Sequence, residues 1–380
     1  MAALPPLLKD LNERTVLDAI RTSAPISRAE ISRRAGISKP TVSLALQSLL
    51  EAGLVREADG DPGRPSYGAV FFEPVPDAAL VLGLDLGARF LRGAVCDLTG
   101  RIRARQDVEL ATAEAATALE AVDGLRASLV QATGVPDERV ESVVVGVPGA
   151  VAGEDGAIRL VANVAGLEGR RFGADLRERL GRPVTLENDI NLAALGERWE
   201  GVARGIDDFV FLSVGTGLGA GVVLRGELQR GHNGAAGELD FVRAGLDQDL
   251  DPCAAAVSQL AVDRGLPPPH DPPSIFAAAR AGDALARAVV AEEARRIALH
   301  VVPIAAVTDV ALVVLGGGVG ANGDLLLEPV RRLLAEWLLY PPRVETSSLG
   351  EAAVLTGALS VGLRSALDSV FVNRPRPARA

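Results

Sequence analysis

The hydrophobic pattern of the chain alternates short apolar runs with glycine-containing turns, and the densest example lies past its midpoint. An apolar run of strand length, residues 209–214, leads into Gly215-Thr216-Gly217, and a second apolar run follows at 221–224. Glycines at this density let backbone N–H groups approach a ligand, and Thr216 adds a hydroxyl donor. The hairpin suits phosphate or sugar oxygens, although a glycine-rich turn alone is more often only a tight hairpin.

Comparable apolar runs recur through the C-terminal part of the chain, and each ends in a polar or glycine-containing turn. Residues 80–84 lead into Asp85-Leu86-Gly87, residues 142–147 into Pro148-Gly149, residues 183–186 into Glu187-Asn188-Asp189, and residues 309–315 into Gly316-Gly317-Gly318. Amphipathic helical segments at 115–133 and 283–302 lie between these runs. This alternation predicts an α/β fold, in which side chains at the ends of strands line a ligand site.

The first 70 residues follow a different pattern of three short helices and a strand pair. Helical periodicity at 12–22 ends before Pro25, Ser27 caps a second helix, and Ser38 caps a third. Apolar residues of the third helix recur at positions 42, 46, 49 and 50, so one face packs on the other two helices. Helix, short helix, turn, helix and a two-stranded wing are typical of a winged helix-turn-helix.

The opposite face of the third helix is polar and predicts contact with DNA. Side chains able to meet phosphates and base edges come from Ser38, Lys39, Pro40, Thr41, Ser43 and Gln47, and further phosphate contacts are expected from Arg28, Arg33, Arg34 and, in the wing, Arg64. The alternative is a small interaction domain that binds no DNA. Residues 9–66 carry nine Lys/Arg against eight Asp/Glu, so we expect two heads to bind one palindromic site together.

The composition of the chain favours some classes of protein and argues against others. Apolar residues make up 48% of the 380 and charged residues 23%, which is typical of a globular protein. The net charge of −10 argues against extensive nucleic-acid or membrane binding by the body. Two cysteines, Cys96 and Cys253, and the lack of a signal-peptide pattern favour a cytoplasmic protein without disulfides. The longest apolar region, 301–319, is broken by Pro303 and Asp309 and does not predict a membrane span.

Several motifs together resemble the ROK family of sugar kinases and of repressors built on the same body. They are the hairpin at 209–224, Leu186-Glu187-Asn188-Asp189-Ile190-Asn191 and Ala236-Gly237-Glu238, with Ser38–Ser43 and Gly63-Arg64-Pro65 in the head. The resemblance implies a winged helix-turn-helix on a two-lobed, actin-like ATPase (ribonuclease H-like) fold. We expect a head at 1–72, a linker at 73–79, a small lobe at 80–186 and 352–372, a large lobe at 187–351, and a disordered tail at 373–380.

The resemblance also assigns roles to individual residues. Asn163, Asn188, Asp189 and Glu238 match positions that contact a sugar, and Asp189 matches the general base of the family kinases. Asp85 and Gly87, with Gly215, Thr216 and Gly217, match the phosphate-binding positions. Without the resemblance, Asp189 could be the N-cap of the following helix, a role compatible with ligand binding. Asn163 and Asp85 could be turn residues, and His232 a surface histidine.

Two departures from the family pattern change the expected function. Where family kinases have Gly and Thr after Asp85-x-Gly87, this chain has Ala88 and Arg89, which would hinder the approach of a phosphate. Where most members continue Gly-Glu-x-Gly-His and add three cysteines, this chain has Phe241 at the His position and only Cys253 downstream. One thiolate cannot build a tetrahedral zinc site, so no metal or other cofactor is expected.

The sequence therefore predicts a non-enzymatic, sugar-responsive regulator, most simply a repressor of carbohydrate genes. Its expected partners are operator DNA, a sugar or sugar phosphate, and further copies of itself in a homodimer or homotetramer. The alternative is an active ATP-dependent sugar kinase with an added DNA-binding domain, which Asp189 and the intact Gly215-Thr216-Gly217 would support.

Overall fold

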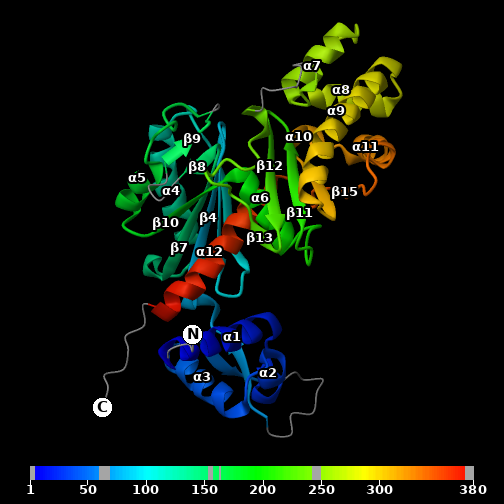
Figure 1. Ribbon diagram of the computed structural model, residues 1–380. Helices are drawn as coiled ribbons and strands as arrows, with labels where there is room; N and C mark the ends of the chain where they lie inside the picture. The colour runs from blue at the N-terminus through cyan, green and yellow to red at the C-terminus, as the bar shows by residue number, and fades with distance from the viewer. Residues whose placement is uncertain (1–4, 60–68, 153–156, 162–163, 242–249, 373–380) are drawn as a thin grey trace.

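The computed structural model describes residues 5–59, 69–152, 157–161, 164–241 and 250–372. Figure 1 shows a small N-terminal head below a larger body of two lobes. Arg64, Asn163 and the tail at 373–380 lie outside the described residues. No described helix is long and apolar enough to cross a membrane, and both cysteines are buried free thiols.

The head is a three-helix bundle with a small sheet. It consists of α1 (Pro5–Ser23), β1 (Ile26–Ser27), α2 (Arg28–Ala35), α3 (Lys39–Glu51), β2 (Val55–Ala58) and β3 (Phe71–Pro74), with strand order β1-β3-β2. The hydroxyl of Ser27 accepts a hydrogen bond from the backbone of Glu30, and that of Ser38 accepts one from Thr41, so the predicted caps are present. Strand β3 continues two residues beyond the predicted end of the head at 72.

The small lobe is built on a five-stranded sheet of order β10-β7-β4-β5-β6. Its elements are the 3₁₀ turn η1 (Pro76–Ala78), β4 (Leu80–Leu86), β5 (Phe90–Asp97), β6 (Ile102–Glu109), α4 (Ala115–Thr133), η2 (Asp137–Arg139), β7 (Val140–Val147), β8 (Ala150–Ala152), β9 (Ala157–Arg159), α5 (Phe172–Leu180) and β10 (Val184–Asn188). Because β10 pairs with β7 as far as Asn188, this sheet extends past the predicted lobe boundary at 187.

The large lobe carries a second five-stranded sheet, of order β13-β12-β11-β14-β15. Its elements are α6 (Asp189–Trp199), β11 (Phe209–Val214), β12 (Leu218–Leu224), β13 (Glu227–Leu228), η3 (Leu239–Phe241), α7 (Ala254–Asp263), α8 (Pro272–Ala281), α9 (Ala284–Thr308), β14 (Leu312–Gly316), α10 (Gly317–Gly320), α11 (Gly323–Trp337), β15 (Arg343–Thr346) and η5 (Gly350–Ala352). The last helix, α12 (Ala353–Val372), returns to the small lobe.

Alternating side chains of β11 show how the large lobe is layered. Val210, Leu212 and Val214 belong to the core shared with α7, α8, α9 and α11. Phe209 and Phe211 point to the other face and pack with Ala193 and Ala194 of α6. The period of two places a hydrophobic residue on each face in turn, as expected for a strand covered on both sides.

Helices α6 and α12 meet at unusually short range. A Cβ placed on Gly196 of α6 would lie 2.3 Å from the carbonyl oxygen of Ala353, and one placed on Gly357 of α12 would lie 1.8 Å from that of Leu192. Only glycine fits at either position. The two helices therefore touch backbone to backbone at these positions.

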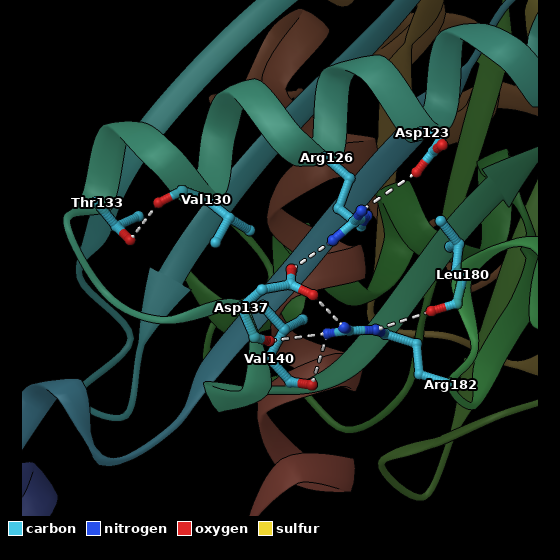
Figure 2. A network of polar contacts seen from close by, with 8 residues as sticks. All are labelled: Asp123, Arg126, Val130, Thr133, Asp137, Val140, Leu180 and Arg182. Atoms are coloured by element: carbon cyan, nitrogen blue, oxygen red, sulfur yellow. Dashed lines mark hydrogen bonds and ion pairs between the residues drawn. The ribbon is translucent and has the colours of Figure 1, made fainter.

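A polar network fixes the small lobe at the end of the sheet where β7 and β10 begin (Figure 2). The guanidinium of Arg182, just before β10, donates to the carbonyls of Asp137 at 3.1 Å and Val140 at 3.2 Å, and also pairs with the Asp137 carboxylate. Arg126 of α4 binds the same carboxylate. This network sets the start of the two parallel strands, whose opposite ends carry the site residues.

Candidate functional site

The residue Asp189 lies where β10 ends and α6 begins, at the junction of the two lobes. Asn188 is the N-cap of α6: its Oδ1 accepts from the amide of Asn191 at 2.9 Å. Its Nδ2 donates to the carbonyl of Gly149 at 3.1 Å, which ties the 148–149 loop to the strand end. Asn188 is thus a buried structural residue with one amide hydrogen left for a ligand. Asp189, which follows it, accepts a hydrogen bond through Oδ1 from the amide of Ile190 at 2.8 Å, which leaves its second oxygen for a ligand.

Carboxylates from both lobes influence one another at this junction. Burial raises the pKa of Asp189 to about 7, and the negative charges of Asp85 and then Glu238 add to the effect. Burial also raises the pKa of Asp85 to about 6, against the lowering effect of the nearby Arg92 guanidinium, whose Nη1 lies 3.6 Å away. We call Asp85, Asp189 and Glu238 the carboxylate cluster. Such a group can accept hydrogen bonds from sugar hydroxyls or a proton from one of them.

The position of Glu238 depends on the glycine before it. Gly237 has φ +89, and a Cβ at this residue would lie 1.8 Å from the carbonyl oxygen of Ala220. Its own carbonyl accepts a hydrogen bond from the Ala220 amide at 2.8 Å, so the backbone lies directly against β12. Glu238 therefore follows a fixed point on the large-lobe sheet. Burial, and next the charge of Asp240, raise its pKa.

An ion pair between a buried carboxylate and a half-exposed arginine, absent from the sequence-based site, joins these elements. Glu187, at the end of β10, accepts hydrogen bonds from the amide of Asn188 and from Nδ2 of Asn191, each at 3.0 Å. Its second oxygen accepts from Nε of Arg230 at 2.7 Å. Arg230 opens the loop that leads to Glu238, so the pair links the two segments bearing Asp189 and Glu238. The only sequence signal was a carboxylate at the end of a buried strand.

The glycine hairpin between β11 and β12 is covered by a carboxylate. The amide of Leu218 donates to Oδ1 of Asp240 at 2.8 Å, and a Cβ on Gly217 would lie 2.3 Å from Oδ2. Gly215 lies against Gly317 and Gly318, and its carbonyl accepts from Ala254. At the tip of the turn, the hydroxyl of Thr216 has no side-chain hydrogen-bond partner among the described residues. Asp240 thus uses one of the backbone donors at this turn.

The other predicted phosphate hairpin is a tight turn. The amide of Gly87 donates to the carbonyl of Phe90 at 2.9 Å. Arg89 is exposed, pairs with Glu109 of β6 at 2.9 Å, and lies over the Phe90 ring with its guanidinium carbon 5.1 Å from the ring centre. Ala88 is half-buried between them. The cation thus has an anionic partner on its own sheet.

The family zinc ligands can be tested only in part, because residues 242–249 and the side chain of Phe241 are not described. Cys253 is buried, and its thiol donates to Asp240 at 3.6 Å. Burial raises the pKa of this thiol, which opposes the thiolate that zinc requires. No group of three or more His, Cys, Asp or Glu suited to a metal occurs within the described residues. Among the described residues, Cys253 is the one side chain that matches a family zinc ligand, and a single thiol cannot form a tetrahedral site. His232 is exposed.

On the head, the predicted DNA-binding residues share one exposed face. Ser38 caps α3 and bonds Thr41, Arg28 donates to Ser43 at 3.2 Å, and Gln47 donates to Glu51. Lys39 and Pro40 are exposed at the start of α3. Arg33 and Arg34 both pair with Glu30, which reduces their availability for phosphates. Sequence reasoning missed Leu44, 69% exposed on the same helix and able to contact a thymine methyl group.

Comparison with known proteins finds a family match for the body and another for the head. The ROK family model matches residues 81–364, three quarters of the chain. The chain belongs to the ROK family. The MarR family model matches residues 10–65, the helix-turn-helix of the head. Both matches confirm the expected family and its combination of a DNA-binding type head with a sugar-kinase-like, actin-like body.

Individual relatives of this ROK protein include both repressors and kinases. A xylose repressor of Caldicellulosiruptor bescii is 25% identical and covers 95% of this chain and 98% of its own. A glucokinase of Thermotoga maritima is 29% identical over 74% of this chain and 96% of its own.

Among solved structures, a ROK transcriptional regulator related to the E. coli MLC protein aligns over 96% of this chain and 98% of its own, with a TM-score of 0.79 at 21% identity, which shows the fold. A Streptomyces griseus glucokinase, solved with glucose and AMPPNP, aligns over 75% of this chain and 100% of its own at 27% identity with a TM-score of 0.65.

Proposed function

We propose that this ROK protein is a sugar-responsive transcriptional repressor of carbohydrate uptake or metabolism genes. Its head binds operator DNA, and the junction between its lobes binds a sugar or sugar phosphate. The observation that carries the proposal is the combination of a helix-turn-helix head with a body that keeps Asp189 and Glu238. The full-length similarity to xylose repressors supports it, whereas the similarity to glucokinases leaves out the head.

In the proposed mechanism, sugar hydroxyls bond the carboxylate cluster and draw the lobes together. Asp189 and Asn188 come from the β10–α6 corner, Asp85 from the small-lobe sheet, and Glu238 from the large lobe. Asn163 would add an amide contact, as the family resemblance implies. Because α6 begins at Asp189 and is fixed to α12, a shift at the sugar reaches the side of the body that faces the head. A ligand changes DNA affinity only through different affinities for the two arrangements.

We further propose that the body is not a kinase. The charge of Asp240 on the β11–β12 turn would repel a nucleotide phosphate there, and Ala88 and Arg89 alter the other turn. We also propose that no zinc is bound and that the protein acts as a dimer or tetramer, which places two heads on a palindromic site. The alternative, an active kinase, rests on Asp189, whose raised pKa suits a general base.

The deciding experiment is a mobility shift on the DNA upstream of the protein's own gene, with a panel of sugars and sugar phosphates that includes xylose and glucose. Salt-sensitive, specific binding that one sugar changes would support the repressor and name its effector. The same panel is given to the protein with ATP and magnesium, and product is measured directly. Turnover comparable to that of a sugar kinase, with no sugar effect on DNA binding, would replace the proposal by the alternative.

A further inference from the structure

A second concave site lies between the head and the body, away from the carboxylate cluster. The cavity is about 490 Å³, in the size range of small-molecule sites. Asp18 and Arg21 of α1 line it from the head, and α6, the following loop and α12 line it from the body. In Figure 1, α1 lies between the body and the rest of the head, so this crevice is not on the α3 face.

The lining is strongly cationic for an acidic protein. It includes four arginines, Arg21, Arg198, Arg204 and Arg364, against two carboxylates, Asp18 and Glu200, which leaves an excess of two positive charges. The whole chain has a net charge of −10. Like charges gathered in a half-enclosed space repel one another, and a bound anion would remove that cost.

These guanidinium groups are only partly used by the protein. The side chains of Arg204 and Arg364 are exposed, and their guanidinium groups have no ion-pair or hydrogen-bond partner within the described residues. Arg21 bonds Asp18 at 3.2 Å and Arg198 bonds Asp207 at 3.0 Å, yet the Nε atom of each is buried with no acceptor in the part of the chain that the structure describes. The guanidinium groups of Arg204 and Arg364 are therefore the ones most available to an anion in the crevice.

Part of the lining of the crevice is apolar and aromatic. Leu195 and Trp199 come from α6, and Leu363 and Leu367 from α12. A lining that combines arginines with aromatic and aliphatic side chains suits a ligand with an organic part and a multiply charged group. Arginine forks are the preferred protein partners of phosphate.

We propose that this crevice binds a small phosphate-bearing metabolite that joins the head to the body. Because Arg21 belongs to the head and Arg204 and Arg364 to the body, one bound phosphate group would bridge the two domains. It would do so at Trp199, the last residue of the helix that begins at Asp189. The protein would then respond to two ligands, a sugar at the lobe junction and a phosphorylated compound at the head.

The test is calorimetric titration of the full-length protein at 150 mM salt with pyrophosphate, and then with inorganic phosphate, AMP and glucose 6-phosphate. We expect saturable binding of pyrophosphate with one site per chain. The double variant Arg204→Gln/Arg364→Gln should weaken it at least tenfold, because both side chains are exposed and their loss spares the fold. Arg21→Gln should weaken it as well, which shows that the head contributes.

The matched control, Arg264→Gln/Arg332→Gln, removes the same charge from exposed positions of the large lobe and should bind as the unchanged protein does. Equal loss in both double variants would show nonspecific attraction and overturn the proposal. So would the absence of saturable binding with all four probes. Binding lost in Asp189→Asn but kept in the crevice variant would place the phosphate at the lobe junction instead. A crevice variant that changes only DNA affinity would make these arginines DNA contacts.

Discussion

The carboxylate of Asp240 accepts a hydrogen bond from the backbone amide of Leu218, with 2.8 Å between Oδ1 and N. It therefore covers the glycine turn that family kinases use for phosphate. If this charge excludes nucleotides, Asp240→Asn should keep the hydrogen bond and remove the repulsion. Two unit charges about 5 Å apart near a protein surface interact by roughly 3 kcal/mol, so a gain in affinity of tenfold or more is within reach.

The measurement for Asp240→Asn is calorimetry with AMPPNP and magnesium, alone and combined with Ala88→Gly and Arg89→Thr. The unchanged protein should bind weakly, Asp240→Asn better, and the triple variant best. Glu336→Gln, at an exposed position of α11, is the charge-matched control. Tight nucleotide binding by the unchanged protein would refute the proposal that the body is not a kinase.

Replacing Asp189 by Asn should abolish the sugar response and leave operator binding intact. The amide keeps the size of the side chain but cannot accept through two anionic oxygens. Because the pKa of Asp189 is about 7, the ionised fraction rises between pH 6 and pH 8, and sugar affinity should rise with it and level off above. Titrations across this range test the sign. Loss of DNA binding together with the sugar response would show that Asp189 is structural.

Arg230→Ala should weaken sugar binding and the fold together. The change removes the half-exposed cation of Glu187 but leaves the hydrogen bonds from Asn188 and Asn191, so the free energy of unfolding should fall by about 1 kcal/mol. Thermal unfolding measures the stability, and sugar titration measures the affinity. Arg230→Lys keeps the charge but not the guanidinium fork. Its stability and its sugar affinity should lie between those of the unchanged protein and those of Arg230→Ala. Full sugar affinity in Arg230→Ala would mean that the Glu187 link does not position Glu238.

Buried Glu293 of α9 should make stability fall as pH rises. Neither of its oxygens has a partner among the described residues, and burial raises its pKa to about 9, against the lowering charge of Arg296. Between its ordinary pKa of 4.5 and this value, the unfolded chain holds fewer protons than the folded one. Stability then declines by up to about 1.4 kcal/mol per pH unit. Denaturant unfolding from pH 5 to 9 should show this decline, and Glu293→Gln should flatten it.

Lys39→Gln should weaken operator binding without changing sequence preference. Lys39 is exposed at the start of α3 and is expected to contact a phosphate. Losing one phosphate contact per head lowers the slope of log affinity against log salt by about 1 for each head bound. Anisotropy titrations at several salt concentrations measure this. An unchanged slope in Lys39→Gln, with Arg332→Gln as control, would remove Lys39 from the DNA interface.

The sequence predicted those parts of the fold whose signals are local. Ser27 and Ser38 are caps recognisable from the residues that follow them, and the strand at 209–214 is an uninterrupted apolar run. Strand β6 gave no such signal, because it is an edge strand and most of its residues are exposed. Helix α5 was also missed, since only nine residues form it and a polar loop precedes it.

The candidate site was likewise predictable only where the signal lies in one residue and its neighbours in the sequence. Asp189 follows a buried strand directly, so its place could be inferred. The Glu187–Arg230 pair joins residues 43 positions apart, and the Asp240–Leu218 bond depends on how a loop folds back on a hairpin. Neither relation exists until the lobe has assembled. Local patterns do not specify contacts of that kind.

The contact between α6 and α12 has a consequence for how a signal would travel. Side chains between helices can change rotamer and absorb a displacement. At Gly196 and Gly357 the helices touch through their backbones, so no side chain can adjust at these two positions. If a sugar binds at Asp189 as proposed, the pair would act as a lever that carries a displacement from Asp189 toward Trp199, beside the head. How strongly DNA affinity responds to the sugar would then depend on the two ends of this lever, where side chains and loops can still rearrange.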